Sequence, residues 1–278
     1  MSSTPSHSDL DIQTSLALIS RQGWLSVIER CEFAVRMQPI VDLRTRGVIG
    51  FEALVRWKHP LFGLLSPQYF LKRLIQAGLI VELTQYVFDR VARFQSHVQS
   101  IGHLLVPVSV NVSATQIEQA EILATVQTVL YQYELPVNAI AIEMTETESV
   151  KDTAMTARCI KSLRLLGVDV YADDMGNGFA AVGNLMDYEF SGIKLDRQFI
   201  SAIGHNIKGA SVITRMTQLA KDLGMSLTAE GIEHEYQVLA LLEMGVTRGQ
   251  GYLFGKPMSR VEALEVLISS PKPILPAV

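Results

Sequence analysis

The segment MQPIVDLRTRGVIGFEALVRW, residues 37–57, decides how the sheet of this chain begins. Two runs rich in strand-forming residues, Met37–Asp42 and Val48–Trp57, are separated only by the polar link Leu43–Gly47. A parallel crossover needs about a dozen residues or more, so a link this short allows only an antiparallel hairpin. The sequence therefore predicts that the first two strands run in opposite directions.

After Trp57 the pattern changes, and strand-like runs alternate with long amphipathic stretches. Six further strands are expected at Leu104–Val112, Ala139–Glu146, Val168–Asp174, Gly192–Asp196, Ser226–Glu233 and Gly249–Phe254. Helices are expected at Ser66–Gln99, Ala114–Tyr133, Thr153–Leu166, Ala180–Tyr188, Gly209–Leu223, Glu235–Met244 and Ser259–Ile268. Eight strands alternating with helices predict the α/β class, as a TIM-like (β/α)8 barrel with an antiparallel first strand.

The ends of the chain differ from this barrel pattern. Met1–Asp9 is polar and is expected to be disordered, whereas Leu10–Arg30 carries apolar residues at helical spacing. We therefore expect an N-terminal tail and helical extension over residues 1–30 and the barrel domain over residues 31–270. Residues 271–278 are Pro-rich and are expected to form a loose C-terminal tail.

Composition excludes several classes of protein. The net charge of −4 gives no general attraction to DNA, RNA or anionic membrane. Cys31 and Cys159 form no CxxC pair, so a disulfide framework or a structural zinc site is not expected. No apolar run approaches the roughly 18 residues of a membrane span, and the N-terminus lacks the pattern of a signal peptide. A cytoplasmic protein fits these features best.

Oxygen-bearing side chains recur near the ends of the predicted strands. Glu52 shares a strand face with Arg56. Glu52 could be a ligand there, or the two side chains could simply form a salt bridge with each other. Asn111 interrupts a run of strand formers and could serve either as a ligand or as a helix cap, a role open to Ser113 as well. Glu143 still belongs to its strand, so it should be at least partly buried, and a buried lone carboxylate would either become neutral or need a cationic partner.

The pair Asp173–Asp174 is the most specific of these signals. Adjacent carboxylates at a strand end repel one another unless a cation lies between them, and capping explains only one of the two. Lys194 lies in a short apolar strand, where it could pair with Asp196 or could hold and help to deprotonate a water molecule.

The last two strands add Glu230, Glu233 and Gln250. Gln250 lies between two glycines, which either leave room for a ligand or mark a bulge. Together the strand ends supply a ring of oxygen ligands with one ammonium group, namely Glu52, Asn111, Glu143, Asp173, Asp174, Glu230, Glu233, Gln250 and Lys194. Such oxygens select Mg²⁺ or Mn²⁺, and this many carboxylates exceed the need of one ion, which favours a two-ion site for phosphodiester hydrolysis.

These motifs, in this order, resemble those of the EAL-domain phosphodiesterases, which hydrolyse cyclic di-GMP to linear pGpG. The resemblance covers about Met37–Met258. It rests on Glu52-Ala53-Leu54 with Arg56, Asn111-Val112-Ser113, Glu143-Met144-Thr145-Glu146, Asp173-Asp174, Lys194-Leu195-Asp196, Ala229-Glu230-Gly231-Ile232-Glu233 and Gln250-Gly251-Tyr252 with Pro257.

The resemblance implies a role for each matching residue. Glu52, Asn111, Glu143 and Asp173 would hold one divalent ion, and Asp173, Asp174 and Glu230 the second, with Mg²⁺ or Mn²⁺ supporting activity and Ca²⁺ inhibiting it. Lys194 would orient the attacking water, and Glu233 and Gln250 would complete the site. The remaining roles are a loop brace at Glu146 and substrate contacts from Gln38, Leu54, Arg56 and Pro257.

One departure from the family bears on regulation. The family loop Asp-Asp-Phe-Gly-Thr-Gly-Tyr-Ser-Ser reads Asp173-Asp174-Met175-Gly176-Asn177-Gly178-Phe179-Ala180-Ala181 here, so its hydroxyl groups are gone. In the family this loop links metal binding to dimer contacts, and a homodimer is expected from the resemblance alone. The N-terminal helix could form a dimer contact, end a linker or bind a regulatory protein partner.

Two other functions stay open on the sequence alone. One is a catalytically silent cyclic di-GMP receptor that acts through a protein partner, although the complete ligand set argues against it. The other is an interaction protein that binds no nucleotide. The family usually acts on the choice between sessile, biofilm-forming life and motility.

Overall fold

The computed structural model describes residues 7–118, 121–145, 153–175, 187–204 and 207–271. Its nine strands are β1 (Phe33–Asp42), β2 (Val48–His59), β3 (Gly63–Leu65), β4 (Val108–Ser113), β5 (Ile140–Thr145), β6 (Asp169–Met175), β7 (Gly192–Leu195), β8 (Ser226–Ala229) and β9 (Arg248–Gln250). The predicted strands are all present, but several start later or end earlier than the apolar runs do.

The hairpin of β1 and β2 has the predicted direction. Its antiparallel register runs from Phe33 opposite Trp57 to Val41 opposite Val48, and it places Gln38 opposite Glu52. The register shifts between Ile40 and Val41, which is the irregularity that leads into the turn. β1 is also antiparallel to β9.

The sheet closes into a barrel through β1. The strand order is β1-β9-β8-β7-β6-β5-β4-β2-β3, and the additional pairing of β1 with β2 joins the two ends. β2 and β4 to β9 pair in parallel along this order, whereas β3 only extends β2 at its far end. The TIM-like barrel with an antiparallel first strand is thus confirmed, and the short strand β3 is an addition that the sequence analysis missed.

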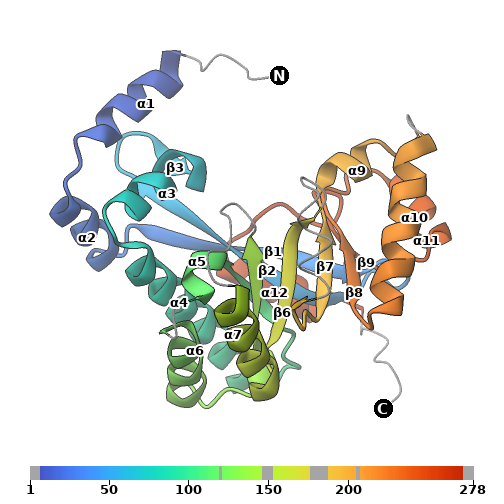
Figure 1. Cartoon of the computed structure of the whole chain (residues 1–278). Helices are drawn as coiled ribbons and strands as arrows, with labels where there is room; N and C mark the ends of the chain where they lie inside the picture. Colours follow the sequence, from blue (N-terminus) through green and yellow to red (C-terminus); the bar gives the residue numbers. More distant parts are fainter. Residues whose placement is uncertain (1–6, 119–120, 146–152, 176–186, 205–206, 272–278) are drawn as a thin grey trace.

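Helices surround the strands in Figure 1, and their buried faces carry the apolar residues that the periodicity identified. The barrel helices are α3 (Pro67–Gln76), α4 (Ile80–Ser100), α5 (Ala114–Ile117), α6 (Glu121–Gln132), α7 (Thr153–Leu166), α9 (Arg197–Ser201), α10 (Ile207–Asp222), α11 (Glu235–Glu243) and α12 (Arg260–Ser269), with a 3₁₀ turn at Val137–Ala139.

The long helix expected at Ser66–Gln99 is two helices. Gly78 has a φ of +65°, a left-handed conformation that glycine adopts easily and that ends α3 before α4 begins. The stretch Ala114–Tyr133 is likewise divided into α5 and α6. The helix expected at Ala180–Tyr188 falls mostly outside the described residues.

The N-terminal extension forms two helices, α1 (His7–Ala17) and α2 (Arg21–Glu29). Ser20 separates them because it caps α2, where its side chain accepts a hydrogen bond from the Gly23 backbone. Leu16 and Trp24 are buried in a second apolar cluster, to which β1, β2, α3 and α4 also contribute. These helices therefore pack against the outside of the barrel instead of extending from it.

Two further expectations concern disulfide bonds and membrane-spanning helices. Both cysteines are free, with Cys31 exposed and Cys159 buried. A search of the described part of the chain found no helix with the length and apolar character needed to cross a membrane.

Candidate active site

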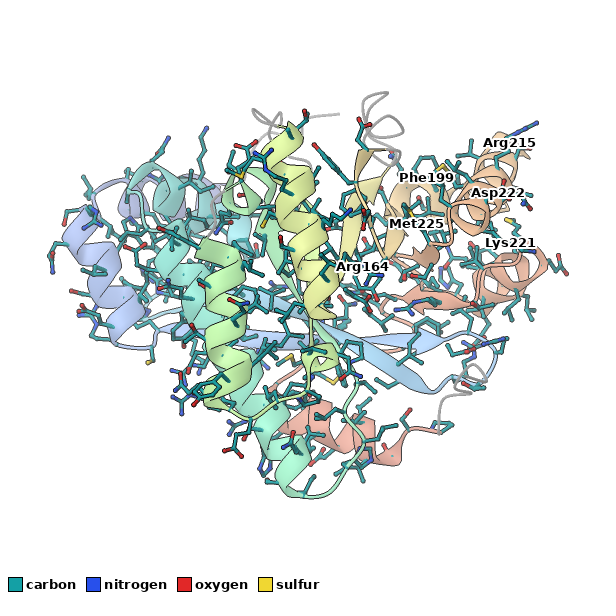
Figure 2. The ribbon with its side chains drawn as sticks, turned by 60° about the horizontal axis from the view of Figure 1, so that its bottom comes forward. Arg164, Phe199, Arg215, Lys221, Asp222 and Met225 are labelled. Atoms are coloured by element: carbon teal, nitrogen blue, oxygen red, sulfur yellow. The ribbon has the colours of Figure 1, made fainter. Side chains whose placement is uncertain are left out.

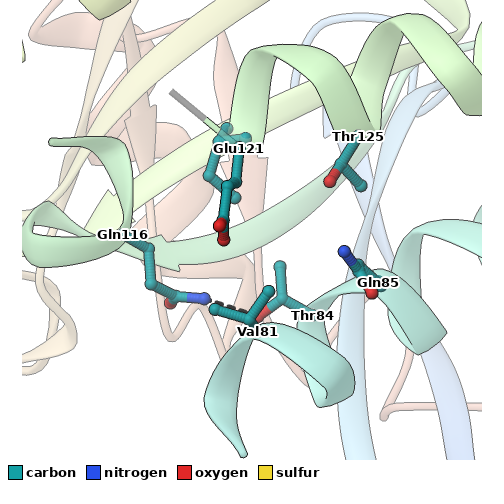
Figure 3. Close-up of a pocket in the computed structure, with 7 residues that line it drawn as sticks. Val81, Thr84, Gln85, Gln116, Glu121 and Thr125 are labelled. Atoms are coloured by element: carbon teal, nitrogen blue, oxygen red, sulfur yellow. Dashed lines mark hydrogen bonds between the residues drawn. The ribbon is translucent and has the colours of Figure 1, made fainter. Parts of the chain in front are cut away.

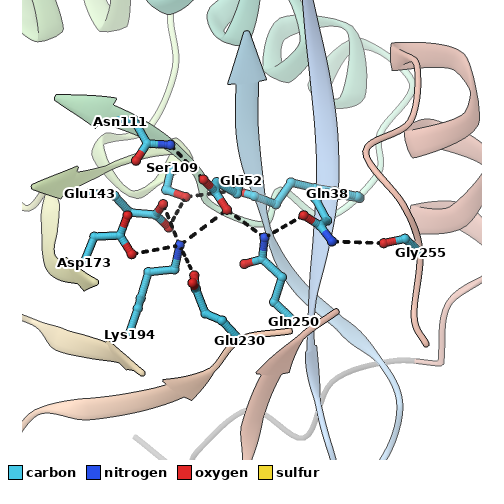
Figure 4. A network of polar contacts seen from close by, with 11 residues as sticks. Gln38, Glu52, Ser109, Asn111, Glu143, Asp173, Lys194, Glu230, Gln250 and Gly255 are labelled. Atoms are coloured by element: carbon cyan, nitrogen blue, oxygen red, sulfur yellow. Dashed lines mark hydrogen bonds and ion pairs between the residues drawn. The ribbon is translucent and has the colours of Figure 1, made fainter. Parts of the chain in front are cut away.

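A buried lysine lies at the centre of the barrel, surrounded by carboxylates (Figure 4). Lys194 on β7 is only 2% exposed. Its Nζ lies 2.7 Å from Oε2 of Glu143 and 2.5 Å from Oε1 of Glu230. The corresponding distances are 3.4 Å to Glu52 and 3.6 Å to Asp173. One ammonium group thus contacts four carboxylates from four different strands or strand ends.

Strand periodicity explains why these side chains meet. Parallel strands keep their carboxyl ends at one end of the barrel, and alternate residues point inward. Asn111 pairs in register with Glu143, and Lys194 pairs with Thr228, two residues before Glu230. Glu52, Asn111, Glu143, Asp173, Lys194, Glu230 and Gln250 are therefore brought together at one end of the barrel.

Amide side chains hold the Glu52 carboxylate in place. Asn111 donates to Oε1 of Glu52 at 2.7 Å, and Gln250 donates to Oε2 at 2.6 Å. The Nε2 atom of Gln250 also lies 3.1 Å from Oε1 of Gln38, and Gln38 in turn donates to the carbonyl of Gly255. This network, which crosses from β4 to β9 and β1, fixes the direction of both Glu52 oxygens.

Several alternatives that the sequence left open are resolved. Ser113, not Asn111, caps α5, in a capping box with Gln116. Asp196 does not pair with Lys194, because its carboxylate caps α9 and accepts from the Gln198 backbone.

The last open alternative was a salt bridge between Arg56 and Glu52. Its guanidinium donates to the Val55 carbonyl at 2.8 Å, and no salt bridge with Glu52 occurs among the described residues. Burial lowers the pKa of Arg56, an effect that the nearby Glu52 charge partly opposes. Arg56 is therefore a half-buried cation beside the mouth, with hydrogen-bonding capacity left for an anionic ligand.

The explanation expected for the two glycines beside Gln250 requires a correction. A Cβ atom on Gly251 would lie 2.0 Å from the carbonyl oxygen of Ile232, and one on Gly249 would lie 2.6 Å from side-chain atoms of Ile232 and Leu43. The two glycines are thus required by close packing of the protein itself. Neither an open space for a ligand nor a bulge at Gln250 explains them.

Burial and mutual repulsion perturb the acids of the site. Burial raises the pKa of Glu143 well above its ordinary value, and the Glu52 charge adds to the rise. Burial also raises the pKa of Glu230 to about 8, against the opposing effect of Lys194. Lys194 itself has a raised pKa, because the surrounding carboxylates outweigh the effect of its burial. Glu52, by contrast, has a lowered pKa, because Lys194 and the two amide donors outweigh its burial.

The donor set fits a divalent cation in its chemistry. Four carboxyl groups face one ammonium, and Glu143 and Glu230 among them have raised pKa values that a bound cation would lower. Carboxylate and amide oxygens suit Mg²⁺ or Mn²⁺. Oε1 of Gln250 is buried and has no hydrogen-bond partner in the described part of the chain. Across residues 7–118, 121–145, 153–175, 187–204 and 207–271, no three His, Cys, Asp or Glu side chains are arranged to hold an ion, and the Lys194 ammonium lies where the carboxylates converge.

Some predicted residues lie elsewhere or cannot be placed. The Glu233 side chain is exposed, and its backbone N–H donates to Gln237. Glu146, the loop at 176–181 and the side chain of Asp174 lie outside the described residues. Leu54 and Pro257 are half-buried, with Leu54 opposite Arg36 on β1.

One site residue was missed. Ser109 is buried, and its hydroxyl donates to Oε1 of Glu143 at 2.6 Å. It precedes Asn111 by two residues, so strand periodicity alone places both side chains on the same inward face. That spacing is the signal that could have identified it.

A separate small cavity lies between α4 and α6 (Figure 3). It is lined by Thr84, Gln116 and Glu121 among others, and Gln116 donates to the Thr84 hydroxyl at 2.8 Å within it. None of the carboxylates around Lys194 reaches this cavity, so it is distinct from the site.

Comparison with known proteins agrees with these motifs. The sequence model of a family described as "EAL domain" matches residues 21–257. The cyclic di-GMP phosphodiesterase RocR of Pseudomonas aeruginosa is 31% identical, covering 86% of this chain and 60% of that protein. The probable cyclic di-GMP phosphodiesterase PdeN of Escherichia coli is 32% identical, covering 84% of this chain and 45% of that protein. This chain thus spans less than two thirds of either relative.

A solved structure shares both fold and sequence similarity. It is described as the PaMucR phosphodiesterase in complex with c-di-GMP, and it is 30% identical with a TM-score of 0.81. The match covers 87% of this chain and 98% of that one.

Proposed function

Because this chain belongs to the EAL domain family, we propose that it is a metal-dependent phosphodiesterase that hydrolyses cyclic di-GMP to linear pGpG in bacterial second-messenger signalling. The observation that carries this proposal is the convergence of Glu52, Glu143, Asp173 and Glu230 on Lys194 at the mouth of the barrel. A site of this charge needs cations, and cations in turn attract a phosphodiester.

The proposed metal ligands are oxygen donors of the strands and strand ends, namely Glu52, Asn111, Glu143, Asp173, Asp174, Glu230 and Gln250. Two divalent cations, Mg²⁺ or Mn²⁺, would supply Lewis acidity and water activation there, and Ca²⁺ would inhibit. The amides of Asn111 and Gln250 already orient Glu52. Their oxygens, which do not make those hydrogen bonds, are left for ligation.

The protein's own groups have separate tasks in the proposed reaction. Lys194 remains cationic, as its raised pKa indicates, so it orients the attacking water and stabilises charge on the phosphoryl oxygens instead of removing a proton. Asp174 and Glu233 are proposed to assist at the water, and Glu146 to brace the neighbouring loop. Water adds to one phosphorus and the sugar 3′-oxygen departs, which opens the ring.

Substrate binding is proposed for Gln38, Leu54, Arg56 and Pro257. Arg56 fits a phosphate because its planar guanidinium can bond two oxygens at once. Gln38 connects this face to the metal ligands, since it bonds both Gln250 and the Gly255 carbonyl.

The test is hydrolysis of cyclic di-GMP by the purified chain with Mg²⁺ or Mn²⁺, followed by chromatography of the products. Glu52→Ala should abolish pGpG formation, whereas Glu189→Ala, in an exposed surface ion pair with Lys161, should leave it unchanged. Tight binding of cyclic di-GMP with no pGpG above the Glu52→Ala level would contradict the proposal and would indicate a receptor.

The biological setting follows from the same proposal. The two free cysteines suit a reducing cytoplasm, and cyclic di-GMP turnover would act on biofilm formation and motility. A homodimer and a regulatory protein partner at the N-terminal helices are further parts of the proposal, and so is the division into residues 1–30, 31–270 and 271–278.

A further inference from the structure

A groove rich in arginine lies on the outside of the barrel, between the first half of β1, α4 and the start of α12. Its volume is about 430 Å³, and its lining includes Arg36, Lys58, Arg90, Arg93 and Arg260 but no acidic residue. We call these five cations and the space between them the basic groove. It is a strong local concentration of positive charge in a chain whose net charge is −4.

Neighbouring acids neutralise only part of this charge. Arg93 pairs with Asp89 at 2.8 Å, and Arg36 lies 3.8 Å from Glu262. Lys58, Arg90 and Arg260 make no salt bridge within the part of the chain that the structure describes. Three cations therefore remain to attract an anion from solution.

Arg90 is held in place without using all its donors. Its guanidinium carbon lies 4.7 Å from the centre of the Tyr86 ring, and the Tyr86 hydroxyl is itself fixed by a 2.6 Å hydrogen bond to the Phe33 carbonyl. One terminal nitrogen lies 3.0 Å from the sulfur of Cys31. The Nε atom is buried and has no hydrogen-bond partner among the described residues. A planar cation fixed in this way loses little entropy when it binds an oxyanion.

The basic groove is separate from the candidate active site. Met37 lines the groove, whereas Gln38, the next residue of β1, points inward and bonds Gln250. Gln38, Gln250 and the carboxylates around Lys194 are not among the residues that line the groove, so the groove and the candidate active site have separate linings.

We propose that the basic groove binds a small, phosphate-rich anion of the nucleoside or inorganic polyphosphate class. The volume lies in the range of small-molecule sites, which is roughly 300–1,000 Å³. Closely spaced phosphates offer several charges to cations that converge on one compact space. This site is independent of the proposed hydrolysis of cyclic di-GMP.

The chain offers a direct test through its cysteines. Cys31 is exposed and lines the groove, whereas Cys159 is buried elsewhere, so the fast phase of thiol labelling by dithionitrobenzoate reports on the groove. Tripolyphosphate and GTP are titrated separately into the metal-free full chain at constant ionic strength, with calorimetry as the second readout. Binding of either one, with slower labelling of Cys31, is the expected result.

Variants distinguish the groove from general charge attraction. Lys58→Gln with Arg260→Gln, at two exposed positions with no salt bridge among the described residues, should weaken binding about tenfold or more. Arg90→Gln should do the same, provided that its melting temperature shows a folded protein. Lys221→Gln on α10, labelled in Figure 2, removes one charge from an exposed position outside the groove and should leave binding unchanged.

Three results would overturn the proposal. In the first, neither tripolyphosphate nor GTP binds. In the second, Lys221→Gln weakens binding as much as the groove variants do. In the third, the protein binds anionic phospholipid vesicles but neither polyphosphate. Each readout is independent of catalysis, so failure here leaves the proposed phosphodiesterase untouched.

Discussion

Nζ of Lys194 lies 2.7 Å from Oε2 of Glu143, and both side chains are almost completely buried. Each group offsets part of the desolvation free energy of the other, because a buried charge without a partner is very costly. The pair nevertheless does not balance the site, since Glu52, Asp173 and Glu230 also face the same ammonium.

Removal of the Lys194 charge should therefore destabilise the metal-free protein strongly. We expect Lys194→Met to lower the free energy of unfolding by about 3–5 kcal/mol, because four carboxyl groups lose the ammonium group that contacts all of them. Denaturant unfolding in the presence of a chelator measures this. Lys161→Met is the matched control, since Lys161 and Glu189 form a pair that is about 60% exposed on both sides and whose loss should cost less than about 1 kcal/mol. Equal losses for the two variants would show that the buried pair has no special importance.

Divalent cations should stabilise the folded protein through the same residues. We expect Mn²⁺ at about 100 times its dissociation constant to raise the free energy of unfolding by about 2.7 kcal/mol over chelator-treated protein. Asp173→Asn should remove this increase. Asp169→Asn, at the start of the same strand and in an ion pair with Arg164, should preserve it. Thermal melts with and without Mn²⁺ are sufficient, and an unchanged response of Asp173→Asn would refute the assigned ligand.

The raised pKa of Glu230 predicts a pH dependence of stability. The group titrates at about 8 in the folded protein, above its ordinary value of 4.5. Between these values the folded state holds a proton that the unfolded state has released, so lowering the pH through this range favours the folded state. Glu230→Gln removes this contribution. The difference in unfolding free energy between the metal-free wild type and this variant should thus increase in favour of the wild type from pH 8 to pH 5, and a flat difference would contradict the shift.

Close packing at Gly251 predicts a severe effect of a single methyl group. Gly251→Ala would place its Cβ 2.0 Å from the Ile232 carbonyl oxygen, so the backbone of one of the two segments must move. We expect a loss of stability of about 3 kcal/mol or more and displacement of the adjacent Gln250 from Glu52. Gly224→Ala is the control, since its Cβ meets no atom within 4 Å and its cost arises from a φ of +68° alone, about 1 kcal/mol. Similar losses in the two variants would argue against the contact.

The sequence predicted those features that depend on local pattern and chain length. The five-residue link Leu43–Gly47 determined the direction of β1, and the positions of Asn111, Glu143 and Lys194 near the ends of predicted strands indicated that they would meet at one end of the barrel. The burial of Glu143 followed from its position within an apolar strand, and the structure confirms it. The two outcomes expected for a buried carboxylate both have support, since Glu143 contacts the Lys194 ammonium and has a raised pKa.

Features that depend on contacts between distant segments were not predictable in the same way. The four partners of Lys194 come from β2, β5, β6 and the end of β8, and no local pattern specifies which of them approaches most closely. The requirement for glycine beside Gln250 arises from Ile232 on another segment. By contrast, Gly78 is an ordinary signal for the end of a helix and Ser20 for the start of one. These two residues are sufficient to predict the division between α3 and α4 and that between α1 and α2.

The reversed direction of β1 changes which end of the barrel receives the incoming polypeptide. Phe33, the first residue of β1, pairs with Trp57 near the end of β2, so the polypeptide enters the barrel at the rim where the parallel strands end. In Figure 1, α1 and α2 accordingly lie beside α3 and β3. With eight parallel strands, the preceding helices would lie at the opposite rim, about one strand length away. Here, the N-terminal helices lie instead at the rim where the parallel strands end, which is the side of the proposed active site.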